Sequence, residues 1–344
     1  MSSGHVSLRF GGVAANTGIR TPSLRRMGAA IAVLTAMGVG LFAMSGAFTS
    51  GVNNSGQPTP TAPLLAPAPT PVCDPAAVAV IDGDFDSCPT WMVDLSSHAD
   101  GEFSDPFLQP YVGAPESNGE AQYYTGNANN LFVRNGLLNL KATTDAREGL
   151  RYSSVRLDTK GRKDFQYGRI VVRAKLPSGT GTWPAIWMLS SQEKYRAHNP
   201  AQSGDHDMAD GEIDIAEAVG TEPGRIYAVA HSQTSWLGQR GGYFSTINVP
   251  DYDSAFHDYE LRWTPTRLTF FVDGKQVYRA DKPAGADYRD WPYDQPYYLI
   301  VNLALGGSWG GADRASFPED GVDPAALPAT MQVQSVVYYP YKGK

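Results

Sequence analysis

The sequence is poor in cysteine and in positive charge. Its 344 residues include two Cys, and 28 Lys and Arg stand against 35 Asp and Glu, which gives a formal net charge of -7 at pH 7. A polyanionic partner such as nucleic acid is therefore not expected, because phosphate binding needs concentrated Lys and Arg. A neutral ligand fits this charge better.

The chain also lacks amphipathic helical patterns. No stretch longer than about a dozen residues has apolar side chains at helical spacing, and Gly and Pro interrupt nearly every interval. Short alternating or β-branched runs recur instead, and two of them contain the turn dipeptides Asn135-Gly136 and Asp273-Gly274. These runs predict an all-β domain, an antiparallel sandwich or barrel with a sheet face open to a long ligand.

Long apolar runs are absent except near the N-terminus. Residues 27–48 carry no charge and are long enough to cross a bilayer, and the basic leader 1–26 would stay in the cytoplasm. The run is predicted to be a signal peptide or a membrane anchor, because small residues near its end also offer a cleavage site. Residues 49–72 are rich in Pro and Thr and are predicted to be a linker. The protein is therefore expected outside the cell or at its surface.

The two cysteines lie where the folded domain, residues 73–344, is expected to begin. Because export is predicted, Cys73 and Cys88 are expected to form a disulfide. Two free thiols are the alternative. A thiolate metal site is not expected, because His98 is the only histidine nearby.

Three carboxylates stand close together in GEIDIAEAVG, residues 211–220. On a regular strand Glu212 and Asp214 share a face, whereas Glu217 points to the other side. A β-bulge near Ile215-Ala216 would add one residue and return Glu217 to the face of the other two. An ordinary solvated strand is the alternative, but three acids without Lys or Arg among them repel one another.

Aromatic residues accompany these acids in the sequence. Indole rings pack on the C–H faces of sugars, while sugar hydroxyls bind Asp, Glu, Asn and His. Acids and tryptophans together therefore favour carbohydrate chemistry, although a core position is the alternative for any single Trp. Cleavage of a glycosidic bond needs two carboxyl groups, one as nucleophile or base and one as proton donor, and Glu212 and Glu217 are the candidates.

These residues resemble glycoside hydrolase family 16. Residues 212–217, Glu-Ile-Asp-Ile-Ala-Glu, are similar to the bulged Glu-x-Asp-x-x-Glu signature of its laminarinase-like branch. Further stretches occur in the order found in the family: 120–124, 181–189, 256–259, 263–265, 271–274 and 302–311.

The resemblance implies an antiparallel β-jelly-roll sandwich with a concave substrate cleft. It also implies an endo-acting, retaining hydrolase of a β-linked polysaccharide, with β-1,3-glucan favoured by the bulged motif. In this scheme Glu212 is the nucleophile, Asp214 assists it, and Glu217 is the acid/base, whose pKa the charge of Asp214 would raise. Substrate contacts are expected from Trp183, Trp187, His231, Asn302 and Trp309. Transglycosylation, cleavage of another β-glucan or a galactan, and non-catalytic β-glucan binding are the alternatives.

No cofactor or catalytic metal is expected, and a structural calcium is the open point. Asp84-Phe85-Asp86 could supply ligands, but Gln334 stands where the family commonly has Asp, and loss of that charge weakens a calcium site. The cluster in residues 205–210 is interpreted as a polar loop at the cleft rim, because adjacent side chains rarely converge on a metal. The expected partner is the polysaccharide itself, with membrane contact through the N-terminal segment only, and the protein is expected to be a monomer.

Overall fold

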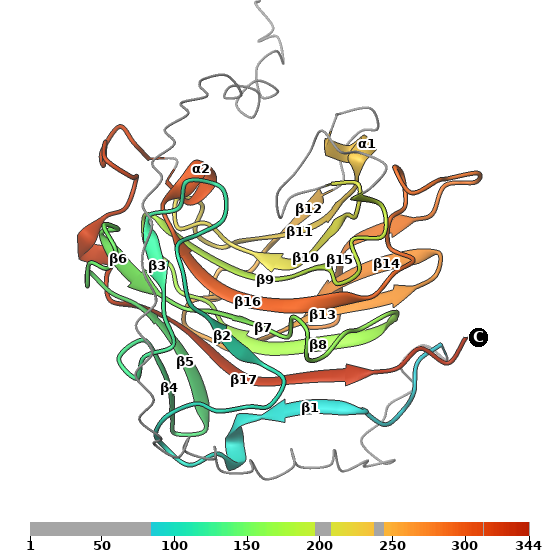
Figure 1. Cartoon of the computed structure of the whole chain (residues 1–344), viewed down its shortest axis with the longest axis horizontal. Helices are drawn as coiled ribbons and strands as arrows, with labels where there is room; N and C mark the ends of the chain where they lie inside the picture. Colours follow the sequence, from blue (N-terminus) through green and yellow to red (C-terminus); the bar gives the residue numbers. More distant parts are fainter. Residues whose placement is uncertain (1–83, 197–207, 237–243, 312, 344) are drawn as a thin grey trace, which may run out of the picture. The chain divides into compact units, whose positions relative to one another are not determined.

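The computed structural model describes residues 84–196, 208–236, 244–311 and 313–343 (Figure 1). All of them belong to one compact unit, residues 63–344. The predicted leader, the apolar run 27–48, the linker, Cys73 and most of the acidic cluster 205–210 lie outside the described residues. Within the described ranges, no helix is long and apolar enough to cross a membrane.

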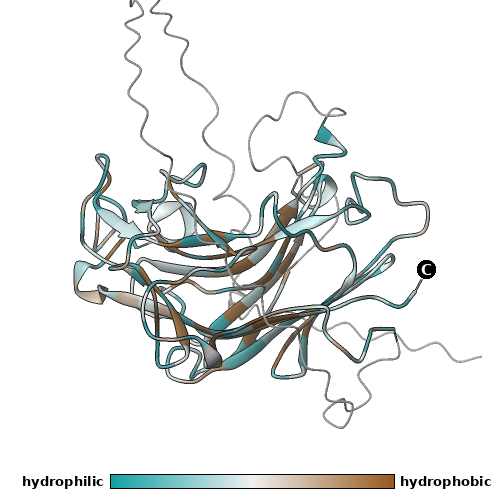
Figure 2. Ribbon diagram, turned by 60° about the horizontal axis from the view of Figure 1, so that its bottom comes forward, coloured by the Kyte–Doolittle hydropathy of each residue, from teal (hydrophilic) through white to brown (hydrophobic). Residues whose placement is uncertain are grey.

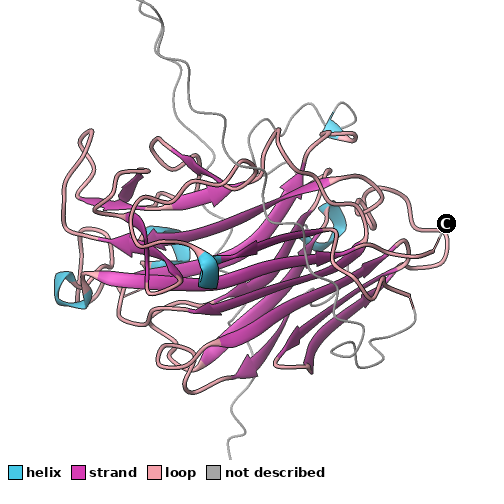
Figure 3. Ribbon diagram, turned by 90° about the horizontal axis from the view of Figure 1, so that it is seen from below, coloured by secondary structure: helices cyan, strands magenta, loops and turns pink. Residues whose placement is uncertain are grey.

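Two antiparallel sheets make up most of the described structure (Figures 1 and 3). The first sheet has seven strands in the order β12-β11-β10-β9-β16-β7-β2. Its strands are β2 (Gln109–Tyr111), β7 (Arg156–Asp158), β9 (Thr182–Ser190), β10 (Glu212–Glu217), β11 (Arg225–His231), β12 (Phe244–Asn248) and β16 (Tyr297–Leu305). Strands far apart in the sequence are thus neighbours, since β16 lies between β9 and β7.

The second sheet has eight strands in the order β15-β14-β13-β8-β17-β5-β4, and β1 also pairs with β17. Its strands are β1 (Trp91–Asp94), β4 (Leu131–Arg134), β5 (Leu137–Ala142), β8 (Gly168–Lys175), β13 (His257–Thr264), β14 (Arg267–Val272), β15 (Lys275–Asp281) and β17 (Ala329–Tyr339). A parallel pair, β3 (Gln122–Tyr124) and β6 (Tyr152–Ser154), stands apart from both sheets. The helices are short: η1 (Leu95–Ser97), α1 (Gln233–Trp236), α2 (Gly307–Gly310) and η3 (Pro324–Ala326).

The core lies between the two sheets, where alternate residues of facing strands pack together. Strand β8 shows the pattern plainly, because buried and half-buried residues alternate along its whole length. The strands carry most of the hydrophobic positions, and the connecting loops are mostly hydrophilic (Figure 2). Both predicted hairpin turns are present, with Asn135 and Asp273 at positive φ before a glycine. The predicted antiparallel β-sandwich is confirmed.

The residues named for a structural calcium do not converge in this fold. Asp84 and Asp86 bond through their backbones to Lys342 and Pro340, beyond the end of β17. Gln334 lies six residues before Pro340, about 20 Å away along an extended strand. Its side-chain oxygen accepts a 2.9 Å hydrogen bond from Arg173 Nε. These residues do not fit a calcium site.

Candidate active site

A β-bulge interrupts β10 at the predicted position. Asp214 pairs with Trp187 of β9, but the next pair joins Ala216 to Ile186, so Ile215 is an extra residue. The register of β10 against β11 shifts over the same interval. Because of this extra residue, Glu217 returns to the face that carries Glu212 and Asp214.

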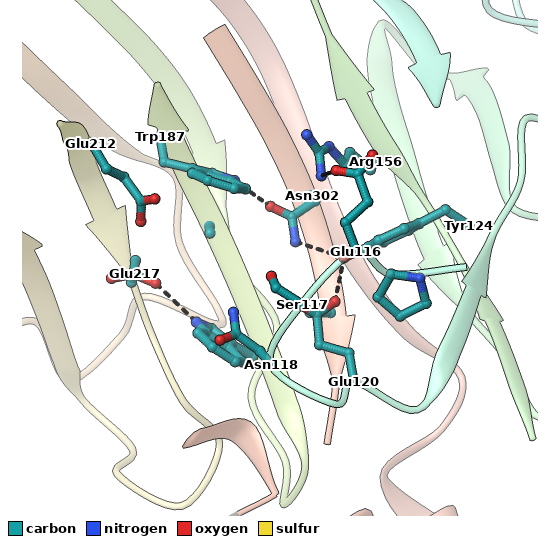
Figure 4. A pocket seen from close by; sticks show the side chains of 14 residues that line it. Glu116, Ser117, Asn118, Glu120, Tyr124, Arg156, Trp187, Glu212, Glu217 and Asn302 are labelled. Atoms are coloured by element: carbon teal, nitrogen blue, oxygen red, sulfur yellow. Dashed lines mark hydrogen bonds and ion pairs between the residues drawn. The ribbon is translucent and has the colours of Figure 1, made fainter. Parts of the chain in front are cut away.

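The bulge separates acids from apolar residues. Ile213, Ile215 and Ala216 point into the core between the sheets, where each is at most 1% exposed. Glu212 and Glu217 both line a pocket on the opposite face of the sheet (Figure 4). The pocket is lined by Pro115, Glu116, Ser117, Asn118, Glu120, Tyr124, Arg156, Trp183, Ala185, Trp187, Glu212, Glu217, Asn302 and Ala304. Three predicted contact residues, Trp183, Trp187 and Asn302, are among them.

Glu217 is buried and accepts a hydrogen bond from an indole. Trp183 Nε1 donates to Glu217 Oε1 over 3.0 Å (Figure 4). Burial raises the pKa of Glu217 well above its ordinary value, and the charge of Asp214 raises it further, while the bond from Trp183 opposes the rise. A carboxyl group whose pKa is raised holds its proton to a higher pH than an ordinary Glu, which suits a group that donates a proton to a leaving oxygen.

Asp214 lies between the other two acids on β10, and 1% of its surface is exposed. Burial raises its pKa well above the ordinary value, and the nearby charge and hydrogen bond of Glu212 add to that rise. His231 Nε2 lies 3.1 Å from Asp214 Oδ2, and His231 faces Glu212 across the β10–β11 pair. Its hydrogen bond with Glu212 thus places Asp214 to orient that carboxylate.

Four residues of the pocket form a chain of hydrogen bonds, which we call the relay. Trp187 Nε1 donates to Asn302 Oδ1 over 2.7 Å, and Asn302 Nδ2 donates to the Tyr124 hydroxyl over 3.0 Å. The Tyr124 hydroxyl in turn donates to Glu120 Oε2 over 2.9 Å. The chain fixes the amide orientation of Asn302 and holds the Trp187 ring at the pocket wall (Figure 4).

Arg156 is a pocket residue that lies in none of the sequence motifs. Its guanidinium lies 5.4 Å from the centre of the Trp187 ring and 5.1 Å from that of Tyr111. Its Nη1 is 3.5 Å from Glu116 Oε2, and 7% of the residue is exposed. The sequence does contain one indication of its role, since it is a charged residue within the apolar strand segment 155–157. A buried cation in a strand needs a specific partner or ligand.

Two predicted contact residues do not line this pocket. His231 lies against Asp214, as described above. Trp309, in α2, packs edge to face on Trp183 with ring centres 5.5 Å apart, and on Tyr227 with ring centres 4.8 Å apart. Trp309 therefore supports the ring that bonds to Glu217.

One cluster of side chains could hold a cation. Possible ligand atoms of Glu212, Asp214 and His231 lie within 4.8 Å of one another. Burial and the neighbouring charge of Glu212 raise the pKa of Asp214, so a cation bound here would have to displace protons from this group.

Comparison with known proteins places this geometry among carbohydrate-active enzymes. Residues 118–317 match the family model described as glycosyl hydrolases family 16. A β-glucanase of Rhodothermus marinus is 40% identical over 266 residues, which cover 74% of this chain and 87% of that protein. A glucan endo-1,3-beta-glucosidase A1 of Niallia circulans is 33% identical over 64% of this chain, and the match spans 32% of its length. The solved laminarinase structure from Rhodothermus marinus superposes with a TM-score of 0.65 at 37% identity, covering 74% of this chain and 98% of that one.

Proposed function

Because the chain belongs to glycosyl hydrolases family 16, we propose that it is a retaining, endo-acting hydrolase of β-1,3-glucan. The observation that carries this proposal is the bulge in β10, which brings Glu212 and Glu217 to one pocket. The relatives named above, a β-glucanase and a glucan endo-1,3-beta-glucosidase, support the choice of substrate. The presence of all three acids favours an enzyme over a non-catalytic glucan-binding protein.

In the proposed first step Glu212 attacks the anomeric carbon. Glu217 gives its proton to the leaving glycosidic oxygen, and a covalent glycosyl-enzyme forms on Glu212. The raised pKa of Glu217 keeps this proton available until the bond breaks. Asp214, buried beside Glu212, holds the nucleophile in position.

In the proposed second step Glu217 acts as a base. It takes a proton from water, the water oxygen attacks the anomeric carbon, and the bond to Glu212 breaks. The product keeps the β configuration, and both carboxyl groups return to their starting states. A sugar hydroxyl can replace the water, which gives transglycosylation.

We assign the pocket side chains to sugar binding. The rings of Trp183 and Trp187 offer faces for sugar stacking, and Asn302 and Arg156 offer polar groups for hydroxyls. His231 contacts Asp214, and Trp309 packs on Trp183, so we assign to each an indirect role through that neighbour.

Localisation is part of the proposal. An exported, monomeric enzyme that is either secreted or anchored by residues 27–48 fits a substrate as large as a polysaccharide. The uncharged run and the Pro-rich segment 49–72 support export. A disulfide between Cys73 and Cys88 would be formed in that compartment.

The test is product analysis on a panel that includes laminarin, mixed-linkage β-glucan, agarose and galactan. We expect cleavage of laminarin to internal fragments, with a β-anomer detected first by NMR. Glu212→Gln should abolish this activity and still bind the glucan. An α-anomer as first product would contradict the mechanism, and cleavage of galactans alone would contradict the substrate.

A further inference from the structure

Aromatic side chains stand on β11 and β12, the strands that follow β10 on the side away from the pocket. Tyr227 of β11 pairs directly with Glu217 of β10, and Phe244 of β12 pairs with Val229 of β11. Val229 in turn pairs with Asp214. Cross-strand partners lie on one face of a sheet, so Tyr227 and Phe244 share the face of the catalytic acids.

Ring contacts join these residues into a series that starts at Glu217. Trp183 bonds to Glu217, Trp309 packs on Trp183, and Tyr227 packs on Trp309. The ring of Phe244 follows, 6.2 Å from that of Tyr227. We call Trp309, Tyr227 and Phe244 the aromatic row.

The row ends in Phe244, a large apolar side chain that the fold leaves exposed. Phe244 is 56% exposed, and in the described part of the chain it shares this state among large apolar residues with Val112 only. Tyr227 is held firmly, because its hydroxyl donates to Glu222 Oε2 over 2.6 Å and Arg225 pairs with the same carboxylate at 2.8 Å. The two rings are tilted 41° to each other, and they offer apolar faces for sugar rings on the same face of the sheet as the catalytic acids.

The position of the row relative to Glu217 identifies its ligand. The polar pocket extends from Glu212 and Glu217 across β9 and β16 to Arg156 on β7. A chain whose retained sugar lies over Glu212 within that pocket must leave across β11 and β12. Phe244 lies two strands from β10, about 10 Å across the sheet.

We propose that Tyr227 and Phe244 bind the sugars on the leaving side of the cleaved bond, the reducing-end portion of the β-glucan. The inference rests on the proposed function, since it assumes that Glu217 protonates the oxygen of that leaving sugar. The same surface receives a glucan acceptor in transglycosylation. There the acceptor hydroxyl attacks the anomeric carbon, its proton passes to Glu217, and the carboxylate of Glu212 is released.

The test compares two substrates that share their retained sugars and differ in the leaving group. Laminarihexaose leaves a sugar chain, whereas 4-nitrophenyl β-laminaritrioside leaves nitrophenolate, which needs no sugar-binding surface. For each variant the measured quantity is kcat/KM on the hexaose divided by kcat/KM on the aryl glycoside. Phe244→Ala should lower this ratio about two- to tenfold, the effect of losing one aromatic contact.

A matched control is Phe132→Ala, on β4 of the other sheet, which should leave the ratio unchanged. A ratio in Phe244→Ala equal to that of the unaltered protein would overturn the proposal. So would an equal loss on both substrates, because it would place the retained sugars on the row. Inactivity of the unaltered protein on both substrates would instead refute the proposed function, and with it the assignment of the leaving sugars to Tyr227 and Phe244.

Discussion

Two buried glutamates, one in each sheet, have pKa values that are shifted in opposite directions from the ordinary value of Glu. Glu217 of β10 is 9% exposed and Glu260 of β13 is 4% exposed, so burial alone does not distinguish them. Burial raises the pKa of both groups. At Glu260 the hydrogen bonds and charges of Arg169 and Arg262 outweigh burial, and the pKa falls below the ordinary value. At Glu217 the neighbouring charge is Asp214, and the pKa rises.

The comparison shows how a strand residue becomes a catalytic acid. Arg169 Nε and Nη2 each donate a 2.9 Å hydrogen bond to Glu260, which gives a bidentate pair that stays ionised. Glu217 has a neutral indole donor in place of a guanidinium. The choice of neighbour therefore decides whether a buried carboxyl group stabilises the fold or carries a proton for chemistry.

The largest expected effect comes from Glu217→Gln. The amide cannot donate a proton to the leaving sugar, so kcat on laminarin should fall about 10²- to 10⁴-fold. Stability should stay equal or rise, because the change removes an ionisable group from a buried site beside Asp214. Activity assays and calorimetry measure the two effects, and a loss of stability that accounts for the loss of activity would contradict the assignment.

The reverse outcome is expected for Glu260→Gln. Removing one partner of a buried pair leaves Arg169 and Arg262 without their counter-charge, and the free energy of unfolding should fall by about 3–5 kcal/mol. The kcat of the folded fraction should change little. Urea titration at neutral pH measures this, and an unchanged midpoint would show that the arginines are solvated well without the acid.

The two glutamates also predict opposite pH effects on stability. The folded pKa of Glu260 lies below its unfolded value, so its contribution is complete above the ordinary pKa of Glu and is lost as the pH falls. The folded pKa of Glu217 lies above its unfolded value, so its contribution is complete at low pH and is lost as the pH rises through the folded pKa. The Gln variants should each remove one of these dependences.

The smallest effect is expected at the relay. Tyr124→Phe removes the hydroxyl between Asn302 and Glu120 and leaves the ring in place. Asn302 then holds the Trp187 ring less firmly, and KM for laminarin oligosaccharides should rise about two- to tenfold with kcat nearly unchanged. Tyr123→Phe, at the adjacent half-buried residue, is the control. A fall in kcat alone, with KM unchanged, would contradict a positioning role.

The sequence predicted the sandwich and the bulge for a physical reason. Alternation along strands such as β8 indicates which face of the strand is buried. Glu217 follows Asp214 by three residues, an odd number, so on a strand the two side chains can share a face only if one residue is added between them. The candidates Trp183, Trp187 and Asn302 were found because they stand in motifs of neighbouring residues.

The remaining site residues depend on contacts between distant segments. Arg156 meets Glu116 and Trp187 only because β7 lies beside β16, and β16 beside β9. Tyr227 and Phe244 lie on the face of the catalytic acids because of the registers of β11 against β10 and against β12. His231 was expected at the substrate, yet the same register places it against Asp214. Pairings of this kind leave no local pattern in the sequence.

The most direct test of the central claim is a pH titration of the glutamate side chains by carbon NMR, with ¹³C-labelled Glu. The signals of Glu217 and Glu260 are assigned by their loss in Glu217→Gln and Glu260→Gln. We predict that Glu217 remains protonated at pH values where Glu260 is already ionised, and that it ionises well above the ordinary range of Glu. A Glu217 signal that titrates together with that of Glu260, or below it, would contradict the account.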